Sequence, residues 1–281
     1  MRMGVSKQLR IQRTLIYIFY GILTILSIIP FWIVIANATR SAEQIKQGPS
    51  LIPGDNLIYN WNVLVEKGFD VFNGITNSFI IAAGSTILSL YFSSLAAYAL
   101  VAYNFKGKKI AYAIILGLIM IPTQVSLVGF YQFMSQLGLL NSFIPLIIPA
   151  IASPATVFFM KQYLETIYHP DLPDSARIDG AGEWKIFHRI ILPQMKPALA
   201  TMGIFSFVTQ WNNFLMPLIL LNDESMFTLP MLVQLLKTDV YRTEFGSMYL
   251  GISLTIIPLL LIYMFLSRYI IGGVTAGSIK Q

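Results

Sequence analysis

The chain has 281 residues, of which 56% are hydrophobic and only 11% are charged, and its formal net charge is +6. A soluble domain carries about 25% charged residues, so this composition excludes an ordinary soluble protein and indicates an integral membrane protein. The absence of cysteine excludes disulfides and metal sites with cysteine ligands. The apolar runs are long and do not alternate in polarity, so we predict an all-α bundle.

Six apolar segments follow one another along the chain, each long enough to cross a bilayer as a helix. The first follows a basic stretch and also fits a signal peptide, with Ala36-Asn37-Ala38 as a cleavage site. Its apolar run is longer than the roughly 7–15 residues of a signal core, so we interpret it as a retained span. We predict one transmembrane domain over residues 1–281, with spans at 15–36, 79–103, 110–133, 143–163, 198–221 and 249–271.

Lysine and arginine are unevenly distributed among the segments that connect these spans. With both termini placed in the cytoplasm, 14 of the 19 basic residues fall inside and 5 fall outside. Cytoplasmic loops of membrane proteins carry such an excess of positive charge, so the distribution predicts the orientation. Topology thereby explains the positive net charge, and we expect no nucleic-acid partner. The longest cytoplasmic loop covers residues 164–197.

The centres of the six spans contain no Asp, Glu, Lys, Arg or His. Ion-coupled carriers usually place ionisable groups there, so their absence weakens the alternative of an ATP-independent carrier. No phosphate-binding loop of the form G-x-x-x-x-G-K-[ST] occurs, and Gly107-Lys108-Lys109 does not fit it. We find no nucleophile–base or metal-ligand constellation either, which argues against a membrane-embedded enzyme. We therefore expect a non-catalytic chain that binds no cofactor or metal itself.

Neutral polar residues do occur within the spans. Gln210 and Asn213 are three residues apart and would share one face of a helix, and Gln124 lies in the third span. Amide groups offer hydrogen bonds without ionic selectivity, so these three residues are candidates for a path taken by a neutral polyhydroxylated solute. Packing between helices is the alternative, and we favour packing for the stripe formed by Ser85, Ser89 and Ser93.

The 164–197 loop gathers charge in a chain that otherwise avoids it. A first helix is predicted over Pro173–Asp179, and Gly180 suits the position after its end because glycine tolerates positive φ. A second helix is predicted over Glu183–Ile191, with an apolar face formed by Trp184, Phe187 and Ile191. The residues alone leave two interpretations open, an interfacial helix among lipid headgroups and a docking element for another protein.

The same stretch resembles the EAA loop of permease subunits in bacterial ABC importers. That motif reads E-A-A, three residues, G, nine residues, I-x-L-P. Here Asp174-Ser175-Ala176, Gly180 and Ile190-Ile191-Leu192-Pro193 keep every spacing. Asp179-Gly180-Ala181 is similar to the form usual in sugar importers. The departures are Asp for Glu at position 174 and Ser for Ala at position 175, both conservative.

Three further stretches resemble carbohydrate permeases of the MalG type. They are "MIPTQVSLVGFYQFM" in the third span, "QWNNFLMPLILL" followed by "FTLP" in and after the fifth span, and the closing "GGVTAGSIKQ". The resemblance covers nearly the whole chain, and four motifs in the same order and topology are highly specific. It implies a type I ABC importer permease fold in a bacterial plasma membrane, which the chain crosses several times.

The resemblance also implies partners and site residues. A second, MalF-like permease, two copies of an ABC ATPase that bind ATP and Mg²⁺, and an extracytoplasmic solute-binding protein would import a sugar or oligosaccharide. The tail at residues 272–281 would reach between the ATPase subunits. An ABC permease for another solute, such as a glycerol phosphoester, is the nearest alternative function. The residues implied in ATPase coupling are Asp174, Ala176, Asp179, Gly180, Ala181 and Glu183.

Overall fold

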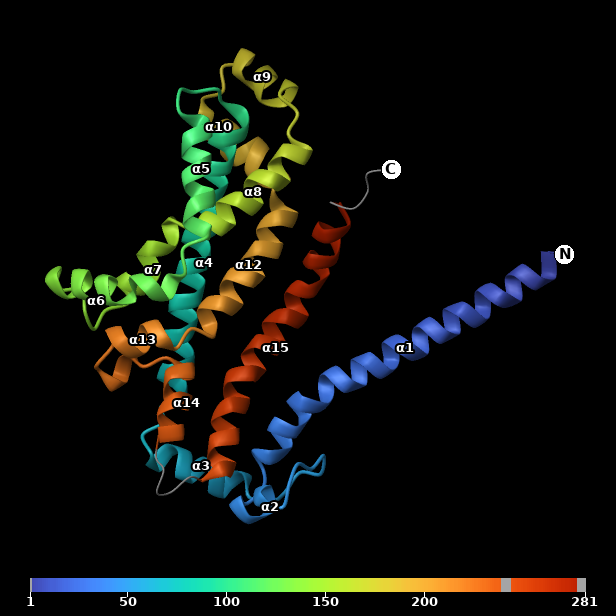
Figure 1. Cartoon of the computed structure of the whole chain (residues 1–281), viewed down its shortest axis with the longest axis vertical. Coiled ribbons are helices and arrows are strands. Elements are labelled where there is room, and N and C mark those ends of the chain that lie inside the picture. The colour runs from blue at the N-terminus through green and yellow to red at the C-terminus, as the bar shows by residue number, and fades with distance from the viewer. Residues whose placement is uncertain (1, 239–243, 277–281) are drawn as a thin grey trace. The chain divides into compact units, whose positions relative to one another are not determined.

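The computed structural model describes residues 2–238 and 244–276, and every regular element within these two ranges is a helix (Figure 1). The all-α prediction is therefore confirmed. The chain divides into two compact units, and each is described by itself below. The first comprises Met1–Phe69 and Val233–Ile256, and the second comprises Asp70–Leu232 and Ile257–Gln281.

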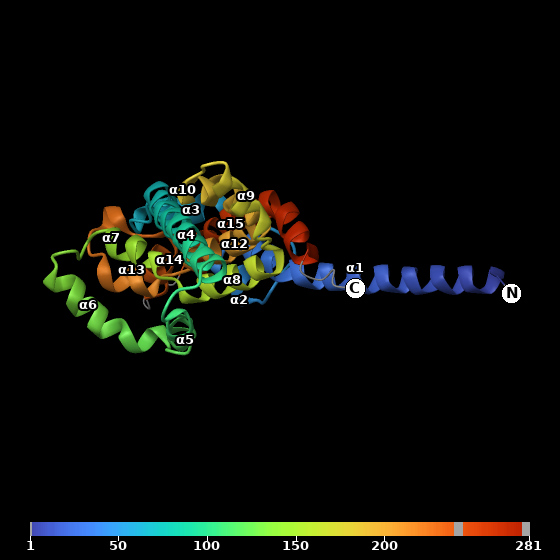
Figure 2. The same cartoon turned by 90° about the horizontal axis from the view of Figure 1, so that it is seen from above.

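Several helices are suited to a membrane by length and composition. Within the described ranges, four are long and apolar enough to cross it: Gln12–Asn37, Val71–Ala102, Ile144–Ile167 and Phe245–Met264. Two bent helix pairs raise the number to six if each pair is counted as one span. Lys108–Ile119 and Gln124–Gln136 meet at 85°, and Glu183–Gln194 and Lys196–Trp211 meet at 77°. Figure 2 shows the first of these bends between α5 and α6.

The third and fifth predicted spans are not continuous helices. α5 (Lys108–Ile119) ends shortly before Pro122, which lacks a backbone N–H and disfavours helical geometry in the residue before it. α12 (Lys196–Trp211) ends just before Asn213, whose Oδ1 accepts a hydrogen bond from the N–H of Met216 at 3.4 Å. Such side-chain bonds to the backbone compete with helix hydrogen bonds, and the separate short helix α13 (Leu215–Leu220) follows.

The first unit contains a buried hydrogen-bond network next to the C-terminal end of α1 (Arg2–Asn37). The Arg40 guanidinium is buried and donates to Asn37 Oδ1 at 2.9 Å and to the backbone carbonyls of Gly48 and Gln44 at 3.1 and 2.6 Å. Asn60 Nδ2 donates to the carbonyl of Arg40 at 3.0 Å. These bonds satisfy the polar groups that burial removes from water. This unit also contains α2 (Ala42–Lys46), α3 (Leu57–Glu66), the last part of α14 (Leu229–Thr238) and the first part of α15 (Phe245–Ala276).

In the second unit, α4 (Val71–Ala102) is the central helix and packs against both α8 (Pro154–Ile167) and α12. The predicted serine stripe is fully buried along it. Ser85 Oγ donates to the carbonyl of Leu146 at 3.0 Å, and Ser89 Oγ donates to Thr156 Oγ1 at 3.2 Å, which confirms the packing interpretation for these two serines. The remaining short helices here are η1 (Thr123–Ser126), α6 (Leu127–Gln136), α7 (Ile144–Ile147), η2 (Ile148–Ile151) and η4 (Glu224–Met226).

Near the N-terminal end of α4, asparagine side chains form hydrogen bonds with the segment that joins α13 to α14 (Leu229–Thr238). Asn77 Nδ2 donates to the carbonyls of Ser225 and Phe227 at 2.9 and 3.0 Å. Asn141 has a φ of 55°, and its Oδ1 accepts from the backbone N–H of Asp223 at 2.9 Å. Asparagine tolerates this left-handed geometry better than most residues. The other end of α4 carries the candidate functional site (Figure 1).

Candidate functional site

The predicted loop folds as two short helices joined by a tight turn. α9 (Asp171–Ile178) ends in a glycine turn at Gly180, whose φ is +80°. Gly180 N–H donates to the carbonyl of Arg177 at 3.0 Å, and Ala181 N–H donates to that of Ala176 at 2.9 Å. This pair of bonds is the Schellman motif, which requires a left-handed residue after the helix. The position predicted for Gly180, in the turn after the helix, is confirmed. Its left-handed conformation is the reason for glycine here, because a Cβ would meet no atom within 4 Å.

The second arm differs from the single helix predicted over Glu183–Ile191. It consists of α10 (Glu183–Ile186), a π-helical turn η3 (Phe187–Ile191) and α11 (Leu192–Gln194). Pro193 removes a backbone N–H that a regular helix would use at this point, and a wider turn accommodates the loss. The predicted apolar face is also wrong at Trp184. Its side chain is 66% exposed and stacks on the ring of His188, whereas Phe187 and Ile191 are buried.

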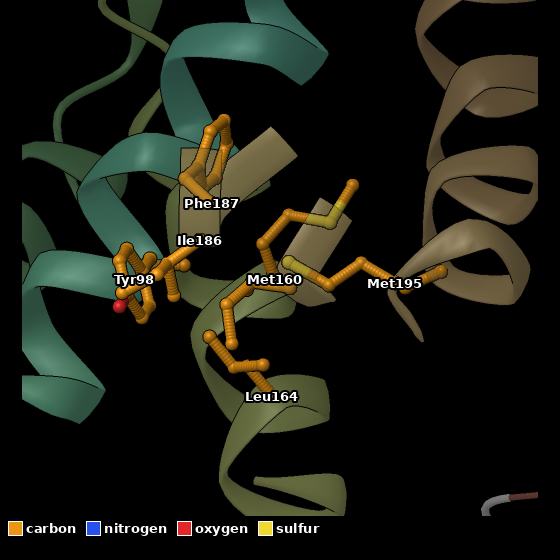
Figure 3. Close-up of a cluster of buried hydrophobic side chains, with 9 residues drawn as sticks. Tyr98, Met160, Leu164, Ile186, Phe187 and Met195 are labelled. Atoms are coloured by element: carbon orange, nitrogen blue, oxygen red, sulfur yellow. The ribbon is translucent and has the colours of Figure 1, made fainter. Parts of the chain in front are cut away.

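A cluster of buried apolar side chains, which we call the base cluster, anchors this second arm (Figure 3). The arm contributes Ile186, Phe187 and Ile191, all exposed by 2% or less. They pack with side chains from α4, from α8 and from the start of α12, so three long helices meet the loop in one core. The other members are Ala97, Tyr98, Met160, Leu164, Met195 and Ala198.

Next to the base cluster, which shares Tyr98 with this group, the carboxylate of Glu183 accepts four hydrogen bonds. Arg177 Nε donates to Oε1 at 2.7 Å, and Arg177 Nη2 donates to Oε2 at 3.3 Å. The hydroxyl of Tyr98 donates to Oε2 at 3.3 Å, and the hydroxyl of Tyr103 makes a short bond to the same oxygen. The bonds from Arg177 and Tyr103 lower the pKa of the Glu183 carboxyl to about 2. Arg177 also pairs with Asp174 at 2.5 Å.

The structure brings all six predicted coupling residues to this turn, but they face different ways. Asp174, Asp179, Gly180 and Glu183 are exposed. Ala176 and Ala181 are half-buried and pack against the base cluster, so their small side chains fit the chain's own core. Three large apolar residues of the loop are exposed. They are Trp184, Leu172, which is 52% exposed, and Ile178, which is 87% exposed.

Sequence reasoning missed this outer apolar surface and the two tyrosines of the network. The surface was hidden because Leu172, Ile178 and Trp184 do not form a helical repeat, and only the turn at Gly180 combines them in one loop. Tyr98 and Tyr103 stand about 80 residues before Glu183, so only the fold reveals their contact. A tyrosine pair at the end of a predicted span, next to a charged loop, was the one available signal.

The predicted path residues are not gathered into one site. Gln124 is exposed in η1, Gln210 is half-buried on α12, and Asn213 lies beyond the end of that helix. Gln210 and Asn213 therefore do not share a helical face, because α12 stops at Trp211. The prediction of a common face is wrong, and the break described above is its cause.

Residues 89–275 match the family described as the inner membrane component of binding-protein-dependent transport systems. The chain belongs to this family. The matched residues include α9 and α10, the base cluster and the whole network around Glu183. The chain is therefore the permease subunit of an ABC importer, as the resemblance at residues 174–193 implied.

Individual relatives agree with the family. The chain is 36% identical over 273 residues to the arabinooligosaccharides transport system permease protein AraQ of Halalkalibacterium halodurans, covering 95% of this chain and 96% of that protein. It is 34% identical over 278 residues to AraQ of Bacillus subtilis, covering 98% of both. In fold it is similar to a chain in the crystal structure of a bacterial ABC transporter involved in the import of the acidic polysaccharide alginate. That match has a TM-score of 0.77 and 21% identity, and it covers 92% of this chain and 96% of the other.

Proposed function

We propose that this subunit forms half of the membrane path through which a bacterial ABC importer takes up a neutral oligosaccharide of the arabinooligosaccharide class. The observation that carries this proposal is the identity of 36% over 95% of the chain to a permease named for that class of sugar. The cation of Lys161, near the middle of α8, already has a partner, because it pairs with Glu165 at 2.6 Å.

A glycerol phosphoester is the competing solute. Its phosphate would favour a cationic group along the path, because a charge that leaves water needs a partner. The described part of α4 and the Phe245–Met264 part of α15 contain no Lys or Arg at all. This observation favours a neutral solute such as an oligosaccharide.

We further propose six spans and both termini in the bacterial cytoplasm. The bent pair Lys108–Ile119 and Gln124–Gln136 acts as the third span, and α12 with α13 forms the fifth, while residues 183–194 stay in the cytoplasmic loop. The distribution of 14 basic residues inside and 5 outside supports this orientation. The chain has no cysteine, so a single introduced cysteine reports its own side of the membrane. A thiol reagent that cannot cross the membrane should label Lys46→Cys in spheroplasts, and label Lys185→Cys only after permeabilisation. The reverse pattern would overturn the orientation.

In this proposal the loop from Asp171 to Gln194 docks on a separate ABC ATPase, which holds ATP and Mg²⁺. This chain then supplies no catalytic group. The exposed Asp174, Asp179 and Gly180 would lie at the contact, with Leu172, Ile178 and Trp184 as its apolar part. Ala176 and Ala181 would act from inside by shaping the turn. The tail from Gly272 is helical as far as Ala276, and the rest of the predicted tail lies outside the described residues.

The full importer is required for the test. The subunit is purified with its partner permease, two copies of the ATPase and the solute-binding protein, and the complex is placed in proteoliposomes. We expect ATP-dependent uptake of labelled arabinooligosaccharide and no uptake without ATP. Uptake of a glycerol phosphoester in preference to the sugar would overturn the substrate assignment. Equal uptake with and without ATP would overturn the importer assignment.

A further inference from the structure

We infer that Arg177 and Glu183, together with the hydroxyls of Tyr98 and Tyr103, form a positioning latch that fixes the loop to α4 so that the two move as one body. This inference rests on the proposed function, because it assigns how the loop transmits motion. It also moves Glu183 from a contact on the ATPase to a contact within this chain.

The latch joins three elements at one carboxylate. Arg177 belongs to α9, Glu183 begins α10, Tyr98 lies in the last part of α4, and Tyr103 directly follows that helix. A carboxylate has about four lone-pair sites, and four hydrogen bonds reach Glu183. Three of these bonds end on Oε2 and one ends on Oε1, so most of the acceptor capacity of the carboxylate is used within its own chain.

Aromatic contacts place the two hydroxyls. The rings of Tyr98 and Tyr103 pack edge to face with centroids 5.5 Å apart, and the ring of Tyr98 lies 5.9 Å from that of Phe187 in the base cluster. The Arg177 guanidinium lies 5.8 Å from the centre of the Tyr103 ring. Two rigid side chains rooted at the end of α4 therefore present both hydroxyls to the loop.

The apolar base cluster and the polar latch have different tasks. Apolar contacts are non-directional, so the base cluster attaches the loop without fixing its angle. Hydrogen bonds to a charged group are short and directional, and they define the angle between α9, α10 and α4. Motion is transmitted between sites through such packed and bonded chains. The side chains of Arg177 and Glu183 are 33% and 48% exposed, so the pair contributes little to overall stability.

The test compares variants in the complete importer in proteoliposomes. Glu183→Gln removes the charge and one acceptor oxygen of the latch, and the double variant Tyr98→Phe/Tyr103→Phe removes both of its hydroxyls. Each variant keeps the size of the side chains. Tyr112→Phe is the matched control, because its hydroxyl accepts a bond from Gln162 at 3.1 Å away from the loop. We measure ATPase bound per permease, and ATP hydrolysed per sugar transported.

We expect both latch variants to bind ATPase as the wild type does. The number of ATP molecules hydrolysed per sugar transported should rise about tenfold, an effect of the size found when interactions between contacting residues are removed. Tyr112→Phe should keep the wild-type ratio. A wild-type ratio in both latch variants would overturn the inference. So would a loss of bound ATPase in Glu183→Gln, which would return Glu183 to the partner interface. These results are distinct from failure of the proposed function, which would appear as a wild-type complex without ATP-dependent uptake.

A double-mutant cycle on Arg177→Ala and Glu183→Ala provides a second measurement. If both side chains act through one pair, the double variant raises the ratio no further than either single variant. Independent, additive effects would contradict the latch.

Discussion

The turn at Gly180 makes the sharpest prediction, through replacement by valine. The φ of +80° costs an ordinary L-residue about 1–2 kcal/mol, and β-branching adds to that cost. A Cβ at this position would meet no atom within 4 Å, so the penalty comes from the backbone and no clash contributes. One to two kcal/mol lowers the equilibrium constant for forming the native turn by a factor of roughly 5–30.

We expect Gly180→Val to insert in the membrane and fold normally, while the amount of bound ATPase and the rate of sugar uptake fall by up to that factor. Gly180→Asn is the matched control, because asparagine adopts left-handed geometry several-fold more readily than other residues. It should recover much of the lost binding. Equal and undiminished ATPase binding in Gly180→Val would refute the claim that this turn shapes the docking loop.

Three further predictions concern other parts of the chain. Phe187→Ala should destabilise the protein by about 3–5 kcal/mol, seen as a lower melting temperature, because it empties the centre of the base cluster. For Glu183, the folded pKa of about 2 lies below its ordinary value of 4.5, so its stabilisation is present above pH 4.5 and lost as pH falls toward 2. Because the pair is half-exposed, we expect only a small difference in melting temperature between wild type and Glu183→Gln near neutral pH, and this difference should vanish in that acidic range. Gly246→Ala should strongly reduce yield and thermal stability, because its Cβ would lie 2.5 Å from the Asn60 amide, whereas Gly21→Ala has open space and should be neutral.

Composition was sufficient for the fold class, local chemistry for the turn, and the resemblance of four motifs for the family. Charge scarcity indicated the membrane, and the distance from Asp174 through Gly180 to Pro193 identified the loop. The left-handed geometry at Gly180 followed from local chemistry, because few other residues adopt it at low cost. These features depend on single segments, so one sequence is enough to predict them.

Helix breaks and contacts between distant residues were beyond the sequence. Apolar runs continue through Pro122 and Asn213, so hydropathy could not show where the helices stop. The inward direction of Ala176 and Ala181 depends on the base cluster, which α4, α8 and α12 assemble from separate parts of the chain. The link from Glu183 to Tyr98 likewise depends on how α4 meets the loop, which no local pattern encodes.

The docking of the loop on an ATPase is the central claim, and a cross-link from Ile178 tests it most directly. This side chain is 87% exposed and the chain has no native cysteine, so Ile178→Cys can carry a short photo-reactive group at one defined place. In the assembled importer, we predict that illumination joins this subunit to the ATPase. Cross-links only to lipid, or to the partner permease, would contradict the account.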